Sequence, residues 1–530
     1  MIGHTDHAQG AGVSPIIQGC YDTMAAFYLR QEPDDCAWPP VKATNFINLA
    51  LIKDQKSWHR TPQKSVDEVV GRKQTTSYHS MLDHIEDCRF TLLEGRPGSG
   101  KTTLMNKISC DWANKKVLKS KLVVFIPLRK LNAEPDRSLA TILRIACPAL
   151  QYDRKMEQLV SHVEDREGEG VVFAFDGLDE YLPSYKAQIG VEKTSFFSRM
   201  KKDITGHHGV DDVFELFHAT LLPKALIVLT SRPAACKEVR KKAKKRIEVL
   251  GFLREQISEY IHYYFDNDKE KAQQLEAHLE THPNLMNMAY LPLHCAMLVF
   301  LYEDDSILPH TESEFYRHFA LSTLLRSQIK RKSGNKVELL SFEQLPPDER
   351  ATFDNVCKLA FEATISSKQV FKSSEVEGTL TKTDRKTNLG LVVRDRYFMR
   401  YGLDETYTFL HLTFQEYLAA IHIAGLNKIQ LLEIIKTYGG HANFREVWKF
   451  LCGMMDYSNP NTMDAFRDLM RRTSKDDVLF QIRCAYESQN ALPCTHIINS
   501  VDNRLIINNT RLSPSDCIAI GYVLNKYSSM

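Results

Sequence analysis

The chain lacks the sequence features of secreted and membrane-spanning proteins. Its N-terminus, MIGHTDHAQG, has neither the basic start nor the apolar core of a signal peptide. Its longest apolar stretch, YLPLHCAMLVFLY at 290–302, is well short of the ~20 residues that cross a bilayer. We therefore expect a soluble, cytoplasmic protein without a membrane partner.

An excess of charge of one sign and paired cysteines are also missing. The 68 basic and 66 acidic residues give a formal net charge of +2, so the charge balance offers no argument for a nucleic-acid partner. The twelve cysteines form no C-x-x-C pair and no Cys/His cluster at zinc spacing. We expect reduced thiols, as in most cytosolic proteins.

Length and composition predict a multidomain globular protein. A chain of 530 residues, 43 % apolar and 25 % charged, has room for about three to five domains. The first segment, 1–75, lacks a regular pattern, and Pro39 and Pro40 break any helix across them. We expect an irregular N-terminal extension or linker there, without an independent signalling domain.

From about residue 88 to 236, apolar runs alternate with amphipathic helical patterns. Each run is almost continuously apolar, as parallel strands buried on both faces require. The predicted strands are RFTLLEG, KLVVFIPL, GVVFAFDG and ALIVLTSR. This segment is therefore predicted to be an α/β domain built on a parallel sheet.

The rest of the chain is predicted to be mainly helical. Two short alternating runs at 389–411 predict a small β-wing, and residues 426–490 return to helical patterns. The basic run Lys237–Arg246 fits the solvated face of a connecting helix better than a nucleic-acid patch. In the tail, the spacing of one leucine-rich repeat is met by Leu505, Ile507 and Leu512, with Thr510 where such repeats often carry Asn.

The strongest motif is GRPGSGKTT, which follows a predicted strand and precedes a predicted helix. It matches the pattern G-x-x-x-x-G-K-[ST] of phosphate-binding loops, whose glycines let backbone N–H groups turn toward the phosphates. Lys101 is expected to reach the β- and γ-phosphate oxygens, and Thr102 to offer its hydroxyl to Mg²⁺. The predicted phosphate-binding residues are Gly95, Arg96, Pro97, Gly98, Ser99, Gly100, Lys101, Thr102 and Thr103.

Two later predicted strands end in residues that would complete this site. Asp176 ends an apolar strand and is expected to hold Mg²⁺ through water. Asp179 and Glu180 lie just past the strand tip, where a carboxylate can orient the attacking water; the alternative for each is a helix cap or a solvated acid. Arg232 ends the next strand and is expected to face the γ-phosphate, because ligands bind beyond the carboxyl ends of parallel strands.

The segment TFLHLTFQEYLAA, at 408–420, contains a histidine between a predicted strand and a predicted helix. Thr413 and Glu416 have the spacing of a capping box, which predicts that a helix starts there. His411 would then lie just ahead of a helix N-terminus, a position that favours an anion. The alternative is a core histidine that packs for shape alone.

These motifs occur in an order that resembles NACHT-domain proteins. The phosphate loop is followed by FDGLDE, LTSRP, a Gly251–Phe252 pair, YLPL and FLHLTFQEYLAA. More narrowly, residues 75–490 resemble nucleotide-binding, leucine-rich-repeat innate immune receptors (NOD-like receptors) of the STAND class of P-loop ATPases. The resemblance implies an N-terminal extension (1–75), a NACHT nucleotide-binding domain (76–236), a helical domain (237–305), a winged-helix domain (306–425), a second helical domain (426–490) and the start of leucine-rich repeats (491–530).

The resemblance also implies roles for two further residues. Pro292, which opens a predicted helix, would contact the adenine end of the nucleotide, and His411 would touch the diphosphate of ADP in a closed state. The chain departs from the family pattern, because its N-terminal region is short and irregular and only one repeat is recognisable. These departures leave open a truncated gene product, a fragment, or a receptor that works through a partner.

The main hypothesis is an ATP/ADP-operated switch of an intracellular receptor in innate immune signalling. ADP would hold the closed state, and exchange for ATP would open the chain, which would then self-associate and engage an effector or adaptor protein. Any hydrolysis would be a slow, Mg²⁺-dependent ATPase. The alternatives are a turnover enzyme, such as a small-molecule kinase or a motor ATPase, and an inert scaffold with a decayed site.

Overall fold

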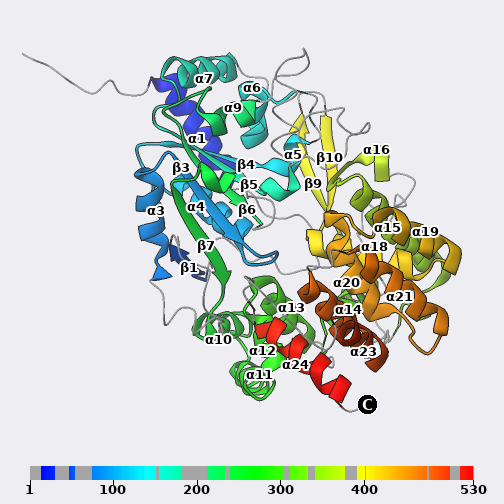
Figure 1. Ribbon diagram of the computed structural model, residues 1–530. Helices are drawn as coiled ribbons and strands as arrows, with labels where there is room; N and C mark the ends of the chain where they lie inside the picture. Colours follow the sequence, from blue (N-terminus) through cyan, green and yellow to red (C-terminus); the bar gives the residue numbers. More distant parts are fainter. Residues whose placement is uncertain are drawn as a thin grey trace, which may run out of the picture.

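The computed structural model contains a sheet domain, a group of four helices below it, and a larger helical region with a small sheet beside both (Figure 1). Two hydrophobic cores account for this division: one fills the sheet domain, and the other runs without interruption through the helical parts. The residues that the structure describes are 14–29, 47–53, 75–132, 134, 136–150, 154–181, 212–232, 239–303, 309, 311–331, 341–376, 391–399, 402–473, 477–501, 512 and 514–528.

The sheet of the first domain has seven described strands. They are β1 (Ala50–Lys53), β2 (Thr75–Thr76), β3 (Phe90–Gly95), β4 (Leu122–Pro127), β5 (Val171–Asp176), β6 (Leu226–Ser231) and β7 (Lys245–Gly251). Their order is β2-β1-β7-β3-β6-β5-β4; the five strands from β7 to β4 are parallel, and β1 is antiparallel to β2 and to β7. The four strands predicted from apolar runs are confirmed as β3 to β6.

Helices cover this sheet (Figure 1). Contacts join α4 to β3, β4 and β5, α6 to β4, and α3 to β3 and β6, while α1 packs on α4 and α7. The elements of this domain outside the sheet are α1 (Pro15–Leu29), α3 (Tyr78–Glu86), α4 (Lys101–Ala113), α5 (Leu128–Leu131), α6 (Leu139–Ala146), η2 (Pro148–Leu150), α7 (Arg154–Asp165), η3 (Leu178–Glu180), α9 (Asp212–His218) and η4 (Val239–Lys241).

The expectation that residues 1–75 are irregular is wrong for two described parts of that segment. The helix α1 buries Ile17, Cys20, Met24 and Tyr28, which recur at helical spacing and pack into the core of the sheet domain. The short strand β1 pairs with β7 inside the sheet. Both elements are amphipathic or apolar pieces that proline and glycine in the surrounding sequence obscured.

The expected connecting helix at Lys237–Arg246 is also wrong where the structure describes it. After the single turn η4, Lys245 and Arg246 begin the strand β7, in which Ile247, Val249 and Gly251 are buried in alternation. The basic residues at the start of the strand concealed this period of two. The sheet therefore extends past the predicted domain boundary at residue 236.

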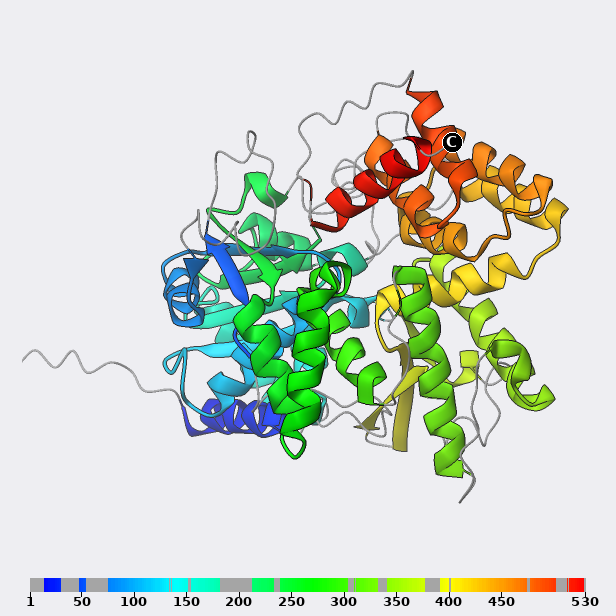
Figure 2. The ribbon, with the colours of Figure 1, turned by 90° about the horizontal axis from the view of Figure 1, so that it is seen from below.

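The second region, α10–α13, lies between the sheet domain and the remaining helices in Figure 2. In α13 eight consecutive residues, His294 to Leu301, are buried, which explains why this stretch is apolar all round. Pro292 opens that helix, as predicted from its sequence position. The four helices are α10 (Arg254–Tyr264), α11 (Lys269–Thr281), α12 (Pro283–Ala289) and α13 (Pro292–Glu303).

The third region combines helices with a three-stranded antiparallel sheet of order β8-β10-β9. The strands β9 (Val392–Met399) and β10 (Gly402–Phe409) form the hairpin predicted at 389–411. Before the last strand come α14 (Glu312–Arg331), η5 (Phe342–Gln344), α15 (Pro347–Ile365), β8 (Val370–Lys372) and α16 (Ser373–Val376). After it come α18 (Leu412–Ala424), α19 (Lys428–Tyr438), η6 (Ala442–Phe444), α20 (Arg445–Met454), α21 (Pro460–Arg472), α22 (Val478–Glu487), α23 (Ala491–Ser500) and α24 (Pro514–Ser528).

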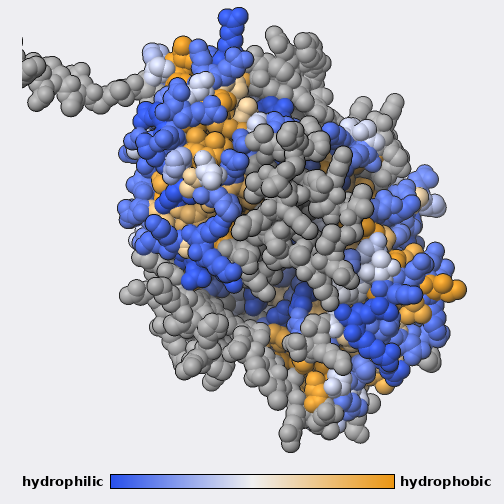
Figure 3. Space-filling model, turned by 45° about the horizontal axis from the view of Figure 1, so that its top comes forward, coloured by the Kyte–Doolittle hydropathy of each residue, from blue (hydrophilic) through white to orange (hydrophobic). Residues whose placement is uncertain are grey.

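The predicted leucine-rich repeat falls largely outside the described residues. Leu505, Ile507 and Thr510 are not among them, and the described parts of 491–530 consist mainly of the two helices α23 and α24. Within the part of the chain that the structure describes, we find no helix with the length and apolar character needed to cross a membrane. Hydrophilic side chains cover most of the described surface in the view of Figure 3, with apolar side chains between them.

We predict that Tyr28→Phe destabilises the sheet domain by about 1–3 kcal/mol, because it leaves a buried backbone group of β4 without its partner. The Tyr28 hydroxyl donates to the carbonyl oxygen of Val123 at 3.3 Å and accepts from the N–H of Phe125 at 2.9 Å. Thermal and urea unfolding of the purified chain measure the change. The half-buried Tyr21 of the same helix supplies the control Tyr21→Phe, and equal effects of the two changes would contradict a structural role for α1.

Candidate functional site

The phosphate loop runs from Gly95, which ends β3, to Lys101, which begins α4. Gly98 and Gly100 have φ values of 73° and 93°, in the left-handed region that glycine adopts without strain. A Cβ atom on Gly100 would lie 2.9 Å from Leu49 Cδ1, so the loop is also packed too closely for a side chain there. The first N–H groups of α4 remain at the loop, as anion binding at a helix N-terminus requires.

Lys101 folds back on the loop that carries it. Its Nζ donates to the carbonyl oxygens of Gly95 at 2.9 Å and of Arg96 at 2.8 Å. Burial lowers the pKa of the Lys101 ammonium, although the nearby Asp179 carboxylate opposes that shift. The lysine is thus held at the loop by two carbonyl groups that a phosphate can replace.

Asp176 lies where a magnesium ion would meet the phosphate loop. It accepts from Thr102 Oγ1 at 2.7 Å and from Thr230 Oγ1 at 2.6 Å. Hydroxyl and carboxylate oxygens suit Mg²⁺, which usually takes one or two protein ligands together with phosphates and water. Among the described residues there is no group of three or more His, Cys, Asp or Glu that could hold a metal alone. The Thr102–Asp176 pair therefore fits Mg²⁺ only in company with a phosphate ligand.

Arg232 and Asp179 form a two-pronged contact beyond the strand tips. The Arg232 Nε lies 2.7 Å from Asp179 Oδ2, and the Arg232 backbone N–H donates to Asp179 Oδ1 at 3.0 Å. Both oxygens of Asp179 are therefore engaged by Arg232 in this arrangement. Glu180, next along the chain, has a carboxyl whose pKa burial raises to about 7, against the lowering influence of Arg129.

His411 is the N-cap of α18. Its Nδ1 accepts from the backbone N–H of Thr413 at 3.2 Å, so the proton of the neutral ring belongs on Nε2. Burial lowers the pKa of His411 to about 3, and the charges of Arg232, Lys101 and Arg129 lower it further. The ring is therefore a neutral Nε2–H donor among cations of the sheet domain.

The predicted capping box at Thr413 and Glu416 is wrong. The helix begins at Leu412, and His411 takes the capping position that the sequence pattern assigned to Thr413. Thr413 lies inside the first turn, and Glu416 Oε1 lies 3.9 Å from a terminal nitrogen of Arg232. The helix lies where the sequence pattern predicted it, but its N-cap is a histidine, which is uncommon in that position.

The start of α13 also touches the phosphate loop. The backbone N–H of Leu293 donates to the carbonyl oxygen of Gly98 at 3.2 Å, and the N–H of Phe252 donates to the carbonyl oxygen of Tyr290 at 2.9 Å. Pro292, predicted to meet the adenine, lies between these two contacts. The structure thus places α13 beside the phosphate loop, Asp176 on Thr102 of that loop, and Arg232 near the helix that His411 caps.

Four residues of this site were missed in the sequence: Leu49, Arg129, Thr230 and Glu416. Thr230 had a signal, since it directly precedes Ser231 at the end of a predicted strand. Glu416 had one too, but its spacing from Thr413 was interpreted as a cap. Leu49 and Arg129 had none, because a lone leucine and a lone arginine carry no motif.

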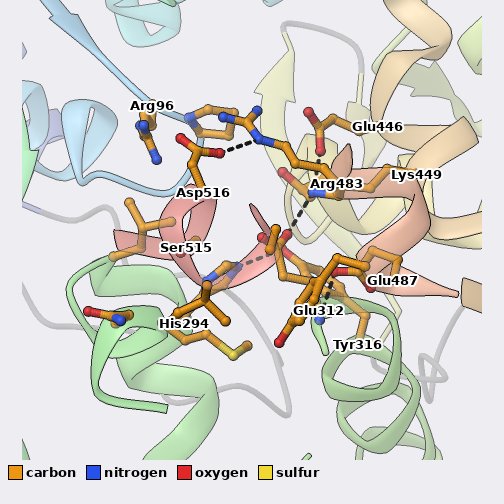
Figure 4. Close-up of a pocket in the computed structure, with 18 of the residues that line it drawn as sticks. Arg96, His294, Glu312, Tyr316, Glu446, Lys449, Arg483, Glu487, Ser515 and Asp516 are labelled. Carbon is orange, nitrogen blue, oxygen red and sulfur yellow. Dashed lines mark hydrogen bonds and ion pairs between the residues drawn. The ribbon is translucent and has the colours of Figure 1, made fainter. Parts of the chain in front are cut away.

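A cavity of about 340 Å³ adjoins the outer side of the phosphate loop (Figure 4). Arg96 and Pro97 form one wall, and the other walls come from α12, α13, α14, α18, α20, α22 and α24. Buried ion pairs line it: Lys449 lies 2.8 Å from Glu312 and 2.6 Å from Glu446, and Arg483 lies 2.6 Å from Asp516. These pairs join the later helices to one another beside the loop.

Comparison with known proteins locates a family match in the first two regions. The model of the NACHT domain matches residues 89–268, which include β3 to β7 and α10. Among solved structures, a STAND protein with a tetratricopeptide repeat sensor from Pyrococcus horikoshii is similar, with 11 % identity and a TM-score of 0.32. That likeness covers 84 % of this chain and 57 % of the other.

Curated relatives match over more of the chain. NACHT, LRR and PYD domains-containing protein 3 of Mus musculus is 27 % identical over 64 % of this chain and 31 % of its own length. Protein NLRC5 of Ictalurus punctatus is 24 % identical over 88 % of this chain and 29 % of its own length. The chain spans about a third of the length of these relatives. With its phosphate loop and strand-end aspartate, it is a NACHT-domain protein of the P-loop NTPase class, similar to the NOD-like receptors.

Proposed function

We propose that this chain is a nucleotide-operated switch that ADP holds closed and ATP opens. The observation that carries the proposal is the position of His411, whose ring caps α18 yet is close enough to Arg232, Lys101 and Arg129 of the sheet domain for their charges to lower its pKa. A diphosphate between the loop and this ring would be bound from both sides. Its loss or exchange would then change the contact between the two regions.

The residues have separate tasks in this proposal. The N–H groups at the start of α4 and the Lys101 ammonium bind the phosphates, and His411 donates from Nε2 to a phosphate oxygen. Bound Mg²⁺, held at Thr102 and Asp176, would supply positive charge to the phosphates. Pro292 and the neighbouring turn would contact the adenine. Arg232 would sense the third phosphate of ATP.

A slow rate of hydrolysis fits the same arrangement. Asp179 gives both of its oxygens to Arg232, so it is not free to orient water while this contact persists. Glu180 is the remaining candidate for a general base. The competing function, a turnover enzyme such as a small-molecule kinase or a motor ATPase, requires a site in which these groups are free. We therefore assign any ATPase activity to resetting the switch.

The wider role is proposed from the relatives. Self-association after opening, engagement of an effector or adaptor protein, a cytoplasmic location and a part in innate immune signalling all follow the NOD-like receptor resemblance. The winged-helix domain expected at 306–425 and the second helical domain at 426–490 would be the parts that swing away. The nucleotide that co-purifies with the chain tests the proposal directly: near-stoichiometric ADP supports a switch, and an empty, rapidly exchanging site supports a turnover enzyme.

We predict that Lys101→Ala abolishes stabilisation of the chain by ADP while the protein remains folded. Ligand binding stabilises a protein by about 2.7 kcal/mol at a hundredfold excess over Kd, and this gain should disappear with the ammonium. Thermal unfolding with and without Mg²⁺–ADP measures it. Lys116→Ala is the control, because Lys116 is an exposed lysine of the same domain that lies 3.8 Å from Asp111 and outside the phosphate loop. An unchanged ADP effect in Lys101→Ala would contradict the loop's assignment.

We predict that His411→Asn releases ADP about 5- to 150-fold faster than the wild type, without loss of helix content. Asparagine is a strong N-cap, so this variant keeps the start of α18 and removes the ring that reaches the phosphates. His411→Ala should release ADP equally fast and lose about 1 kcal/mol of stability besides. Stopped-flow dissociation of a fluorescent ADP, with light scattering for self-association, separates the two roles. If His411→Asn holds ADP as long as the wild type, the histidine is only a cap.

We predict that ATP hydrolysis slows as the pH falls below about 7, because Glu180 must be deprotonated to act as a base and its raised pKa is about 7. Glu180→Gln should lower the rate by about a hundredfold and remove this pH dependence, with ATP affinity within about tenfold of the wild type. Phosphate release across a pH series measures both. Glu169→Gln, an exposed acid of the same domain, should behave as the wild type. A collapse of ATP affinity in Glu180→Gln would instead make Glu180 a metal ligand.

A further inference from the structure

Glu416 is a buried acid whose carboxyl group is only half satisfied. It projects from α18, one turn after His411, and is 5 % exposed. Its Oε1 lies 3.9 Å from a terminal nitrogen of Arg232, while its Oε2 is buried without a hydrogen-bond partner among the described residues. Burying an unpartnered carboxyl oxygen costs stability, so packing alone does not account for an acid at this position.

Arg232 connects this acid to the sheet domain. Its Nε and backbone N–H hold Asp179, which follows β5, and its far end points to Glu416 on α18. Asp179, Arg232 and Glu416 thus form a row of charged side chains that links the sheet domain to α18. Arg232 is also the group proposed to sense the third phosphate of ATP, so Glu416 and that phosphate compete for one guanidinium.

The contact between Glu416 and Arg232 is weak enough to be broken. Its 3.9 Å separation is longer than a hydrogen bond, and burial raises the pKa of Glu416 to about 8 in spite of the arginine. Of the other charged groups around it, Glu446 and Asp179 raise this pKa further and Lys449 lowers it. A γ-phosphate with its full charge would displace such a partner, whereas ADP brings nothing to the same place.

We propose that Glu416 is a positioning residue that holds Arg232 on the α18 side in the closed state and thereby makes this state prefer ADP to ATP. The inference rests on the proposed function and assigns the ADP preference to one contact. In the absence of Glu416, the terminal nitrogen of Arg232 loses its acidic partner on α18 and can turn to a third phosphate, while Nε keeps its contact with Asp179. ATP then gains affinity relative to ADP, and the chain opens at lower ATP concentrations.

The test compares the affinities of Glu416→Ala for Mg²⁺–ADP and for a slowly hydrolysed ATP analogue with those of the wild type. We expect the preference for ADP to fall about fivefold or more. The matched control is Glu487→Gln, which changes another buried acid, one whose carboxylate accepts from Ser313 of α14. That change should lower the melting temperature and leave the ADP-to-ATP affinity ratio unaltered.

A thermodynamic cycle with Arg232 distinguishes competition from simple packing. In an Arg232→Ala background, Glu416→Ala should have no further effect on the affinity ratio, because the shared group is gone. Glu416→Gln provides a variant of unchanged size. Above about pH 8, where Glu416 of the wild type carries its charge, Glu416→Gln should lose the preference for ADP as Glu416→Ala does. Well below that pH, the ADP-to-ATP affinity ratio of Glu416→Gln should match that of the wild type.

The outcomes separate this inference from the proposed function. If the wild type binds both nucleotides and Glu416→Ala keeps the wild-type ratio, the positioning role is overturned and the switch stands. If Glu416→Ala changes the ADP-to-ATP affinity ratio equally with and without Arg232, the positioning role is overturned as well, because the effect then does not depend on Arg232. A wild-type chain that binds neither nucleotide overturns both.

Discussion

The hydrogen bond from the Leu293 N–H to the Gly98 carbonyl oxygen fixes the position of α13 on the phosphate loop. Everything that follows α13 is packed on it, directly or through its neighbours, because residues 294–301 of this helix lie at the centre of the second core. Gly98 has no side chain, and the Leu293 side chain occupies the space that one would need. One backbone contact thus ties the ligand-binding loop to the helical half of the protein.

The second core and the cavity beside it determine how the parts can move. Aromatic and aliphatic residues from α10 to α24 form a single cluster, but the cavity between α12–α13 and the later helices is lined by buried ion pairs, which form a polar layer there. Near the site, the helical half meets the sheet domain through the long Arg232–Glu416 pair, the Leu293 bond and the packing of the Leu293 side chain on Gly98. A rearrangement at the site therefore costs less at these polar contacts and at the polar layer than within either core.

The parallel strands and the phosphate loop were predictable because each is determined by residues that are adjacent in the sequence. A strand buried on both faces must be an apolar run, and a loop that wraps phosphate must contain glycines before its lysine. The helix α1 and the strand β7 were not recognised, since a helix that follows Gly and His and a strand that begins with Lys245 and Arg246 contradict their own local signals.

The candidate site was predictable only in part. His411 was expected at a helix N-terminus and lies there. It is itself the N-cap, so Glu416 takes no part in capping and lies near Arg232 instead. The approach of Glu416 to Arg232 depends on the packing of regions distant in sequence, and no local sequence pattern predicts it.

The strand order has a consequence for synthesis of the chain. The strand β3 lies between β7 and β6, and both of these are made long after it. While the ribosome translates the intervening segment, the backbone N–H and C=O groups along both edges of β3 lack their final partners, and β1 likewise lacks β7. Unpaired apolar strands pair readily with other chains, so the nascent protein is open to aggregation until residue 251 has emerged. The order of the strands thus makes a chaperone most useful during that interval.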